Sequence, residues 1–322
     1  MRVPSAPRIE RLLLAEITFP EWHPRFADGG CQVFGYAIRH PDGVILFDTG
    51  VGTGSSFIDD LYHPRVVPIA EALAQHGIDE RDVVVVVNSH LHFDHCGQNE
   101  FFHDRGVPIY AQAAEMEAAQ TFGYTVPEWV AIPQRSLRVA HGDEDIADGV
   151  SLIETIGHTP GHQSLMVETG DGRVIVGGQC VYCADELTAR QVAADNVHDE
   201  SFVEAARQSL DRVIAFDPRE VVLAHDATQW PSSADALLRI GAAIGHPVPM
   251  DDVRAFATPE EAALAEWDAY PDVEVRVLRV DYRDENDAVV ITDTVPSHPM
   301  YNYCKRTVSG WVFMNDSGPA VV

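Results

Sequence analysis

The sequence predicts an α/β fold over its first 246 residues and a small α+β extension after them. Three observations support this prediction: a pair of apolar runs around a turn, a run of five valines, and an amphipathic helical stretch followed by another short apolar run. Strands that alternate with helices are typical of α/β proteins. With 322 residues, of which 46% are hydrophobic and 22% charged, the chain is long enough to bury a sizeable core.

A β-hairpin is the first predicted element. Val33–Arg39 and Val44–Phe47 are apolar runs that flank Pro41-Asp42-Gly43, and these three residue types favour a tight turn. Asp48-Thr49-Gly50 ends the second run and begins a glycine-rich loop. A helix is expected next, from Pro68 to His76, because its apolar residues have helical spacing and a glycine follows it.

The five valines Val83–Val87 predict a buried strand that is apolar on both faces. The run ends at Asn88-Ser89, directly before a cluster of histidines. Loops at the carboxyl ends of buried strands often carry function, because the rigid sheet fixes their roots. A helix is expected near Ala111–Gln120.

The second half of the first domain predicts more strands and one long helix. The stretch from Ser151 to Val176 indicates three short strands separated by two turns. Phe202 to Phe216 has its apolar residues on one helical stripe, which predicts an amphipathic helix. Val221–Leu223 is again a short apolar strand, and it ends close to His225.

The character of the chain changes after His246, and Pro247 marks the predicted boundary between domains 1–246 and 247–322. In the tail, Thr258-Pro259-Glu260-Glu261 is a helix start, with a Thr cap and Pro at the first position. The alternation in Val273–Val280 and Ala288–Ile291 predicts a small antiparallel sheet. The apolar segments Pro299–Tyr303 and Trp311–Phe313 leave three roles open: covering a site, forming a homodimer, or packing within the tail.

Composition narrows the class of protein. The net charge of −28 repels phosphodiester backbones, so no nucleic-acid partner is expected. No apolar run approaches the ~18 residues of a membrane span, and the first ten residues lack a signal-peptide pattern, so no membrane association is expected. The five cysteines are odd in number and scattered, which favours a reducing, cytoplasmic location over a disulfide framework.

A metal centre is predicted directly after the valine strand. His90, His92, Asp94 and His95 form the pattern H-x-H-x-D-H within six residues. Neutral imidazole is a ligand for zinc, iron, copper and nickel, and a carboxylate oxygen suits a hard or borderline divalent ion. Clustered histidines on a surface are the alternative, and two later histidines at strand ends argue against it.

Those later candidates are His162, in Gly157-His158-Thr159-Pro160-Gly161-His162, and His225. Either histidine alone is more often a hydrogen-bonded structural group than a ligand. Together with the first cluster they supply the ligands of a site with two divalent ions ~3.5–4 Å apart.

These motifs resemble the metallo-β-lactamase superfamily. The amino-acid sequence of the segments Ser89–Gly97 and His158–Leu165 is most similar to the N-acyl-homoserine-lactone lactonase branch, which is known for quorum quenching. The resemblance covers roughly residues 30 to 245. It implies an αββα sandwich, in which two sheets pack face to face with helices outside and the metals lie at one edge. Asp48-Thr49-Gly50 resembles the family's aspartate turn that supports the metal loops.

The resemblance also implies a ligand set. It places His90, His92 and His162 around a first metal ion and Asp94, His95 and His225 around a second, with His158 as a neighbour. Zn²⁺ is the expected cofactor, one or two per chain, although manganese, cobalt and iron accept the same ligands.

One position departs from the family pattern. Aligning the end of strand 173–176 puts Gln179 where the family has an aspartate that bridges both metals. Three consequences stay open: Gln179 binds one metal weakly, the second site is empty or labile, or Asp185 or Glu186 takes over. Cys180-x-x-Cys183 is either ordinary packing near the site or a metal or redox pair.

The resemblance implies hydrolysis of a lactone or related ester by attack of a metal-bound hydroxide on the carbonyl. Asp94 would hold or relay a proton, and Tyr182 matches the lactonase tyrosine that hydrogen-bonds the substrate, a plain core tyrosine being the alternative. Phe19, Trp22 and Phe26 either line an acyl site or pack in the core. Two other hypotheses about the function stay open: a mononuclear iron oxygenase on the same fold, and a non-catalytic member of the family that binds metal.

Overall fold

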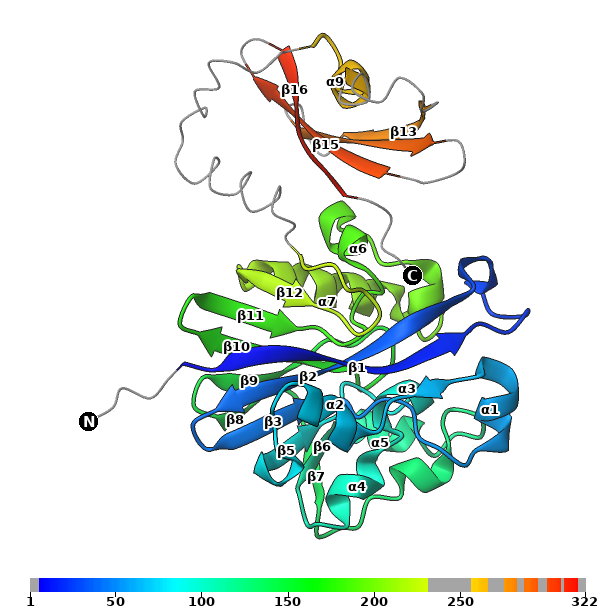
Figure 1. Ribbon diagram of the computed structural model, residues 1–322, viewed down its shortest axis with the longest axis vertical. Coiled ribbons are helices and arrows are strands. Elements are labelled where there is room, and N and C mark those ends of the chain that lie inside the picture. The colour runs from blue at the N-terminus through cyan, green and yellow to red at the C-terminus, as the bar shows by residue number, and fades with distance from the viewer. Residues whose placement is uncertain are drawn as a thin grey trace. The chain divides into compact units, whose positions relative to one another are not determined.

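A computed structural model describes residues 6–230, 256–265, 275–282, 287–294, 300–307 and 310–317. The chain divides into two compact units, residues 1–230 and residues 231–321, and each is described by itself (Figure 1). The predicted domain boundary at 246/247 lies outside the described residues and stays a prediction.

The first unit contains two β-sheets. The seven-stranded sheet has, in spatial order, β4 (Arg65–Val66), β1 (Arg8–Thr18), β2 (Gly30–His40), β3 (Gly43–Phe47), β5 (Val83–Val87), β6 (Ile109–Gln112) and β7 (Leu137–Ala140). The five-stranded sheet has β12 (Glu220–Val222), β11 (Gly172–Val176), β10 (Gln163–Thr169), β9 (Val150–Glu154) and β8 (Glu144–Ala147).

The helices of this unit lie outside the sheets (Figure 1). The α-helices are α1 (Ser56–Tyr62), α2 (Ile69–Gln75), α3 (Phe93–Cys96), α4 (Asn99–His103), α5 (Ala113–Ala118), α6 (Ala184–Ala189) and α7 (Val203–Ala215). The connections between elements contain short 3-10 turns: η1 (Phe26–Asp28), η2 (Glu80–Asp82), η3 (Pro127–Val130), η4 (Ala194–Asn196) and η5 (Glu200–Phe202).

Alternating strand residues build three apolar layers. On β3, Ile45 and Phe47 face the second sheet, whereas Val44 and Leu46 face the layer that contains α2. On β11, Val176 faces the first sheet, and Ile175 faces α6 and α7. Because successive side chains of a strand point to opposite faces, each sheet is apolar on both sides and is covered on both. The expected αββα sandwich is therefore confirmed.

The predicted hairpin is also confirmed. β2 and β3 pair antiparallel with Tyr36 opposite Phe47 and His40 opposite Gly43. The turn glycine, Gly43, has φ +134°, which a residue with a side chain rarely adopts. The predicted helix at Pro68 to His76 corresponds to α2, the three strands of the second half to β9, β10 and β11, and the long amphipathic helix to α7.

Two expectations need correction. The valine strand β5 is not apolar and buried on both faces throughout, because the Val84 side chain is 39% exposed. The β3–β5 ladder shifts register between Val44 and Ile45, so that Val84 is the extra residue of an irregularity and turns outward.

In the stretch expected as a helix near 111–120, residues Ile109–Gln112 form strand β6, and α5 begins only at Ala113. Parallel pairing with β5 and β7 overrides the helical spacing there.

The second unit is a helix with an antiparallel sheet, as the tail sequence predicts. Its strands are β13 (Val275–Tyr282), β14 (Asp287–Thr294), β15 (Met300–Thr307) and β16 (Gly310–Ser317), in that order, and α9 spans Pro259–Ala265. The Thr258 hydroxyl accepts the Glu261 N–H at 3.2 Å, which is the expected N-cap. Ala262 and Ala263 of α9 pack against Val290 of the sheet.

In the portions of the chain that the structure describes, no helix is both long and apolar enough to cross a lipid bilayer.

Candidate metal centre

The candidate site lies where two pairs of parallel strands end. β3 and β5 are parallel neighbours in the first sheet, and they deliver Asp48 and the loop that begins at Asn88. β11 and β12 are parallel neighbours in the second sheet, and they lead to Gln179 and His225. Carboxyl ends of parallel neighbours lie at one edge of a sheet, so these segments, distant in sequence, meet.

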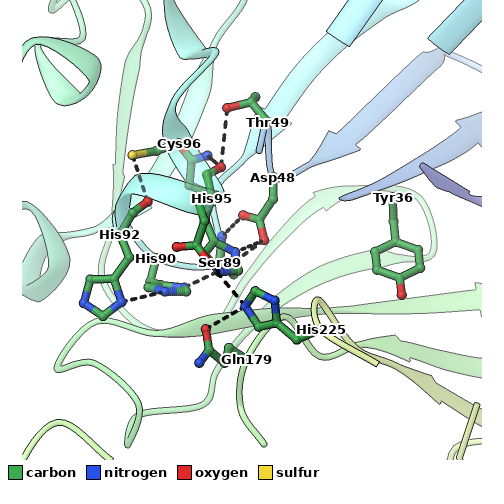
Figure 2. A network of polar contacts seen from close by, with 12 residues as sticks. Tyr36, Asp48, Thr49, Ser89, His90, His92, His95, Cys96, Gln179 and His225 are labelled. Carbon is green, nitrogen blue, oxygen red and sulfur yellow. Dashed lines mark hydrogen bonds and ion pairs between the residues drawn. The ribbon is translucent and has the colours of Figure 1, made fainter. Parts of the chain in front are cut away.

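Asp48 holds the loop that carries His90, His92, Asp94 and His95, called the histidine loop below. It has φ +62°, in the left-handed region, and its side chain is buried. Oδ1 accepts the Ser89 N–H at 2.7 Å, and Oδ2 accepts the Ser89 hydroxyl at 2.8 Å and the His95 Nδ1–H at 2.8 Å (Figure 2). The His95 ring is thereby oriented so that Nε2 points into the site.

The same loop rests on the glycine-rich segment after Asp48. The Gly97 N–H donates to the Gly50 carbonyl at 2.7 Å. A Cβ on Gly97 would lie 1.9 Å from the Gly52 nitrogen, and one on Gly52 would lie 2.4 Å from the Gly97 carbonyl oxygen. The two segments therefore touch backbone to backbone, which requires glycine at both positions.

A third support is a residue that the sequence analysis missed. Glu115, on α5, is completely buried, and it binds both the histidine loop that follows β5 and the turn at residues 157–162. Oε1 accepts the Leu91 N–H at 2.8 Å and the Tyr124 hydroxyl, while Oε2 accepts the Thr159 hydroxyl at 2.7 Å and the Gly161 N–H at 3.1 Å. A single glutamate in a helix of ordinary composition gives no signal of this role.

The first group of possible ligands is His90, His92 and His158. His90 Nε2 and His158 Nε2 each lie 3.1 Å from His92 Nδ1. The far nitrogens are held from outside: His90 Nδ1 lies 2.9 Å from the Ser89 hydroxyl, and His158 Nδ1 donates to the Asn196 carbonyl at 3.3 Å. Three imidazole nitrogens thus converge on one point.

The second group is Asp94, His95 and His225. Asp94 Oδ2 lies 3.5 Å from His95 Nε2 and 3.4 Å from His225 Nε2. His225 Nδ1 donates to the Gln32 carbonyl at 3.0 Å, so its Nε2 carries the lone pair toward the group. Gln179 adjoins this group, because its Oε1 is 3.1 Å from His225 Nε2 (Figure 2).

These atoms fit a cation. Asp94 Oδ2, Gln179 Oε1 and the inward nitrogens of His95 and His225 are electron-pair donors that face one another. His95 Nε2 is buried without a hydrogen-bond partner among the residues that the structure describes. Burying such acceptors together is unfavourable unless a positive charge lies between them. Imidazole and carboxylate are the donor set of Zn²⁺ and related divalent ions.

The pKa values of the histidines follow their surroundings. Burial and the neighbouring histidines lower the pKa of His90 and His158 well below the ordinary value, and that of His92 to about 4. In the second group burial also lowers the pKa of His95, but Asp94 and Asp48 outweigh it and raise the pKa overall. The first group therefore holds neutral imidazoles, the form that binds a metal.

His162 lies beside the first group in a different arrangement. Its Nε2 accepts the Gln179 N–H at 3.0 Å, and its Nδ1 lies 2.8 Å from the Thr155 hydroxyl. Both ring nitrogens therefore have partners, and the His162 ring centroid is 5.4 Å from that of His90. His158, expected as a neighbour, lies with His90 and His92 in the first group, and the expectation that His162 is the ligand stays a prediction.

Glu186, after Gln179, binds backbone groups of its own loop. Glu186 accepts the Ala193 N–H at 2.9 Å and the Tyr182 N–H at 3.2 Å, and it lies 3.8 Å from the Arg25 guanidinium. Cys180 and Cys183 are not among the ligand groups found in the described residues, and burial raises the pKa of each thiol to about 12. Asp185 has no place in those groups either.

Tyr182 lies against the second group. Its ring stacks on His225 at 5.2 Å between centroids, and the Arg25 guanidinium covers its ring at 3.7 Å. Its hydroxyl is buried without a hydrogen-bond partner in the described part of the chain. Burial and the Cys31 thiol raise the pKa of Tyr182, so the hydroxyl keeps its proton at neutral pH.

Comparison with known proteins identifies the family of the chain. A family model of the metallo-beta-lactamase superfamily matches residues 28–225. The match covers more than half of the chain, and the chain belongs to this superfamily.

Its relatives include lactonases. An N-acyl homoserine lactonase of Bacillus sp is 35% identical over 149 residues, which are 42% of this chain and 58% of that protein, so the chain spans 58% of that relative's length. The N-acyl homoserine lactonase AttM of Azorhizobium caulinodans is 29% identical over 229 residues, 61% of this chain and 82% of that protein. A solved structure of a mutant AiiA from B. thuringiensis, with N-decanoyl-L-homoserine bound at the active site, has a TM-score of 0.57 at 25% identity and covers 69% of this chain and 94% of that chain.

Proposed function

We propose that this protein is a metal-dependent hydrolase that opens a lactone or a related ester. The observation that carries the proposal is the pair of adjacent donor groups at one edge of the sandwich, His90, His92 and His158 beside Asp94, His95 and His225. The lactonases among its relatives support the choice of substrate class. The chemistry of the ligands favours zinc. Two divalent ions held there would polarise the carbonyl and lower the pKa of bound water, so that hydroxide is available near neutral pH.

The protein's own residues then have distinct tasks. His90 and His92, with a third histidine of the 157–162 turn, bind the first ion, and Asp94, His95 and His225 bind the second, with the Gln179 oxygen beside it. Asp94 is the carboxylate next to both His95 and His225, and it relays the proton that must reach the leaving alkoxide. Tyr182 donates its unpartnered hydroxyl to the carbonyl side of the substrate.

Aromatic residues beside the metal loop indicate an apolar substituent on the substrate. Phe93, within the histidine loop, packs on Tyr62 at 4.5 Å, and Tyr62 meets the edge of Trp22 at 6.3 Å between centroids. Trp22 is 64% exposed, so this aromatic row runs from the metal loop to solvent. Such a row supplies the apolar contact that an acyl chain needs. Phe19, by contrast, is buried and stacks on His23, and Phe26 is exposed.

The test is metal content per chain, by elemental analysis of protein purified without chelator, together with turnover of a panel of lactones with short and long acyl chains. We expect bound divalent metal and ring opening, and we expect His92→Ala and His225→Ala to abolish turnover. His141→Ala, at an exposed histidine outside the site, is the control and should keep full activity. Full activity in His92→Ala or His225→Ala would remove the metal mechanism, and one iron per chain without lactone opening would favour an oxygenase.

A further inference from the structure

Arg25 is a mostly buried cation beside the second donor group. It lies in the loop between β1 and β2, and 19% of its side chain is exposed. Its Nε lies 2.7 Å from Asp195 Oδ2, and its Nη2 donates to Asp195 Oδ1 at 3.3 Å, so the guanidinium meets both oxygens of one carboxylate. Glu186 Oε1 lies 3.8 Å from the same Nη2. Because a guanidinium is a flat fork, these contacts fix its plane as well as its position.

The backbone at Arg25 is held by its own loop. The Arg25 N–H donates to His23 Nδ1 at 3.1 Å, and the Arg25 carbonyl accepts the Asp28 N–H at 2.9 Å. The His23 ring in turn stacks on the buried Phe19, with 4.1 Å between ring centroids. Arg25 is therefore fixed at both ends, by the β1–β2 loop at its backbone and by acidic residues of the segment 184–196 at its guanidinium.

The Tyr182 ring lies between Arg25 and His225. The Arg25 guanidinium carbon is 3.7 Å from the Tyr182 ring centroid, and the His225 ring, inclined by 18° to the Tyr182 ring, has its centroid 5.2 Å from the same point. Two flat groups at these separations would overlap if they shared one face of the ring. They therefore lie on opposite faces, and the Tyr182 ring cannot move toward either side.

The same ion pairs reach the backbone of Tyr182. Glu186 Oε1, the oxygen that faces Arg25, accepts the Tyr182 N–H at 3.2 Å. At the far end of the side chain, the Tyr182 hydroxyl is buried and has no hydrogen-bond partner among the residues that the structure describes. The direction of the hydroxyl is therefore determined by contacts of the ring and the backbone, and not by a hydrogen bond of its own.

A cation over a phenol ring also affects what the hydroxyl can do. When a phenol donates to a carbonyl oxygen that is gaining negative charge, the phenol oxygen becomes more negative itself. A positive charge over the ring favours that change, so the interaction is stronger in the transition state than in the ground state, which is the condition for raising kcat.

We propose that Arg25 is a positioning residue for Tyr182: from the ring face opposite His225 it holds the Tyr182 hydroxyl toward the substrate carbonyl and supports its donation there. The inference rests on the proposed function, because it requires a reaction in which the Tyr182 hydroxyl donates. It gives the β1–β2 loop a task in the chemistry, although no residue of that loop belongs to the two donor groups.

The first experiment measures kcat and KM of the full, metal-loaded chain with the lactone of the panel that the wild type opens fastest. Arg25→Met keeps an apolar chain over the ring and removes the charge, so kcat should fall by about 3–10-fold, while KM changes by less than about twofold. Arg25→Gln, which removes the charge but can still donate to Asp195, should show a loss of the same size, and it replaces Arg25→Met if that variant does not fold.

The matched control for these variants is Arg207→Met, at an exposed arginine of α7 that pairs with Glu204 and Asp211. It removes an arginine with two acidic partners away from the site, and it should keep the wild-type kcat. The melting temperatures of all variants show whether they remain folded. Wild-type kcat in folded Arg25→Met or Arg25→Gln would overturn the inference.

A double-substitution cycle separates positioning from stability of the loop. Tyr182→Phe keeps the ring between Arg25 and His225 but removes the hydroxyl, and kcat should fall by about 10–100-fold. If Arg25 acts through the hydroxyl, Arg25→Met should lower the kcat of the Tyr182→Phe chain by less than about twofold. An equal loss in both backgrounds would show that Arg25 only stabilises the loop, and would overturn the inference.

Two further outcomes distinguish the inference from the proposed function. Wild-type kcat in Tyr182→Phe would overturn the inference, since there would be no donation to support, and would leave lactone opening intact. A wild-type chain that opens no lactone would overturn the proposed function together with the inference.

Metal content tests for an indirect effect through His225. Because Arg25 and His225 lie on opposite faces of Tyr182, Arg25→Met should retain the wild-type number of divalent ions per chain in elemental analysis. Loss of an ion from folded Arg25→Met would show that Arg25 acts on the metal centre, and would contradict its assignment to Tyr182.

Discussion

Buried carboxylates at this site bind several donors each, and those donors come from different loops. Asp48 accepts three hydrogen bonds from the segment 89–95, and Glu115 accepts four from residues on both sides of the site. Charge-assisted hydrogen bonds are stronger than neutral ones, and a buried carboxylate with all its donors in place is well compensated. The geometry of the metal loops therefore depends on residues that bind no metal.

Replacing Glu115 tests this dependence. In Glu115→Gln the new amide NH₂ must face either the Leu91 N–H or the Gly161 N–H, so one buried donor loses its acceptor, at a cost of about 1–3 kcal/mol. We expect the free energy of unfolding of the metal-free protein to fall by that amount in urea denaturation. Glu117→Gln, on the exposed face of the same helix, should change it by less than about 0.5 kcal/mol. Equal stability of Glu115→Gln and Glu117→Gln would show that the four contacts contribute nothing.

At the residue scale, the sequence indicated the side chains that converge at the site more clearly than the residues that hold them in place. H-x-H-x-D-H is a local pattern, so His90, His92, Asp94 and His95 stand out in one segment. Glu115 acts through contacts with segments far along the chain, and it does not lie in a recognisable motif. His158 and His162 are four residues apart in one turn, so the sequence pattern alone does not decide which of them binds a metal.

At the scale of elements, the long loop between β1 and β2 folds back onto the site. The Phe19 N–H donates to the Gly29 carbonyl at 3.1 Å and closes the loop. Inside it, His23 stacks on Phe19 with 4.1 Å between ring centroids, and its Nδ1 accepts the Arg25 N–H at 3.1 Å. Burial lowers the pKa of His23 below its ordinary value of 6.5, with the Arg25 charge acting in the same direction and Asp195 opposing it.

This shift predicts a pH dependence of stability. The folded-state pKa lies below 6.5, so on acidification the unfolded chain takes up the proton before the folded chain does. The stabilisation is fully present above about pH 6.5 and is lost as the pH falls through the folded-state pKa. Between pH 7.5 and 5.5 the urea midpoint of the wild type should therefore fall further than that of His23→Phe, which keeps a ring beside Phe19 but cannot be protonated. Parallel pH curves for the two proteins would contradict this.

Sequence reasoning identified elements with strong local signals and missed those that depend on pairing. The hairpin around Gly43 and the amphipathic α7 carry their own turn and periodicity signals. Strand β1 was not predicted, because what makes Arg8–Thr18 a strand is its long antiparallel register with β2. β6 was missed for the same reason, since its neighbours β5 and β7 hold it in the sheet.

For the whole molecule, every residue of the two donor groups belongs to the unit formed by residues 1–230. That unit contains the apolar layers between and outside its two sheets. The second unit has an apolar cluster of its own, formed by α9 and its sheet. The covering, homodimer and self-packing roles of the tail, and the domain limit at 246/247, stay predictions.

A truncated chain tests this division. Residues 1–230 produced alone should bind the same number of Zn²⁺ ions per chain as the full protein, with affinity within about threefold, since all ligands and their supports are present. Circular dichroism of the truncated chain provides the control for folding. Loss of a metal ion from a folded 1–230 chain would show that the tail contributes to the site.

The backbone contact between Gly52 and Gly97 limits how this site can change in evolution or in a directed library. A codon change at either position introduces at least a methyl group where only a hydrogen fits, so both are closed to variation, and the two loops cannot be varied independently. Under the proposed function, variation that alters substrate range is expected on the other side of the histidine loop, where Phe93, Tyr62 and Trp22 form the aromatic row. The side of the site formed by Gly52 and Gly97 is therefore fixed, whereas the side formed by the aromatic row can vary.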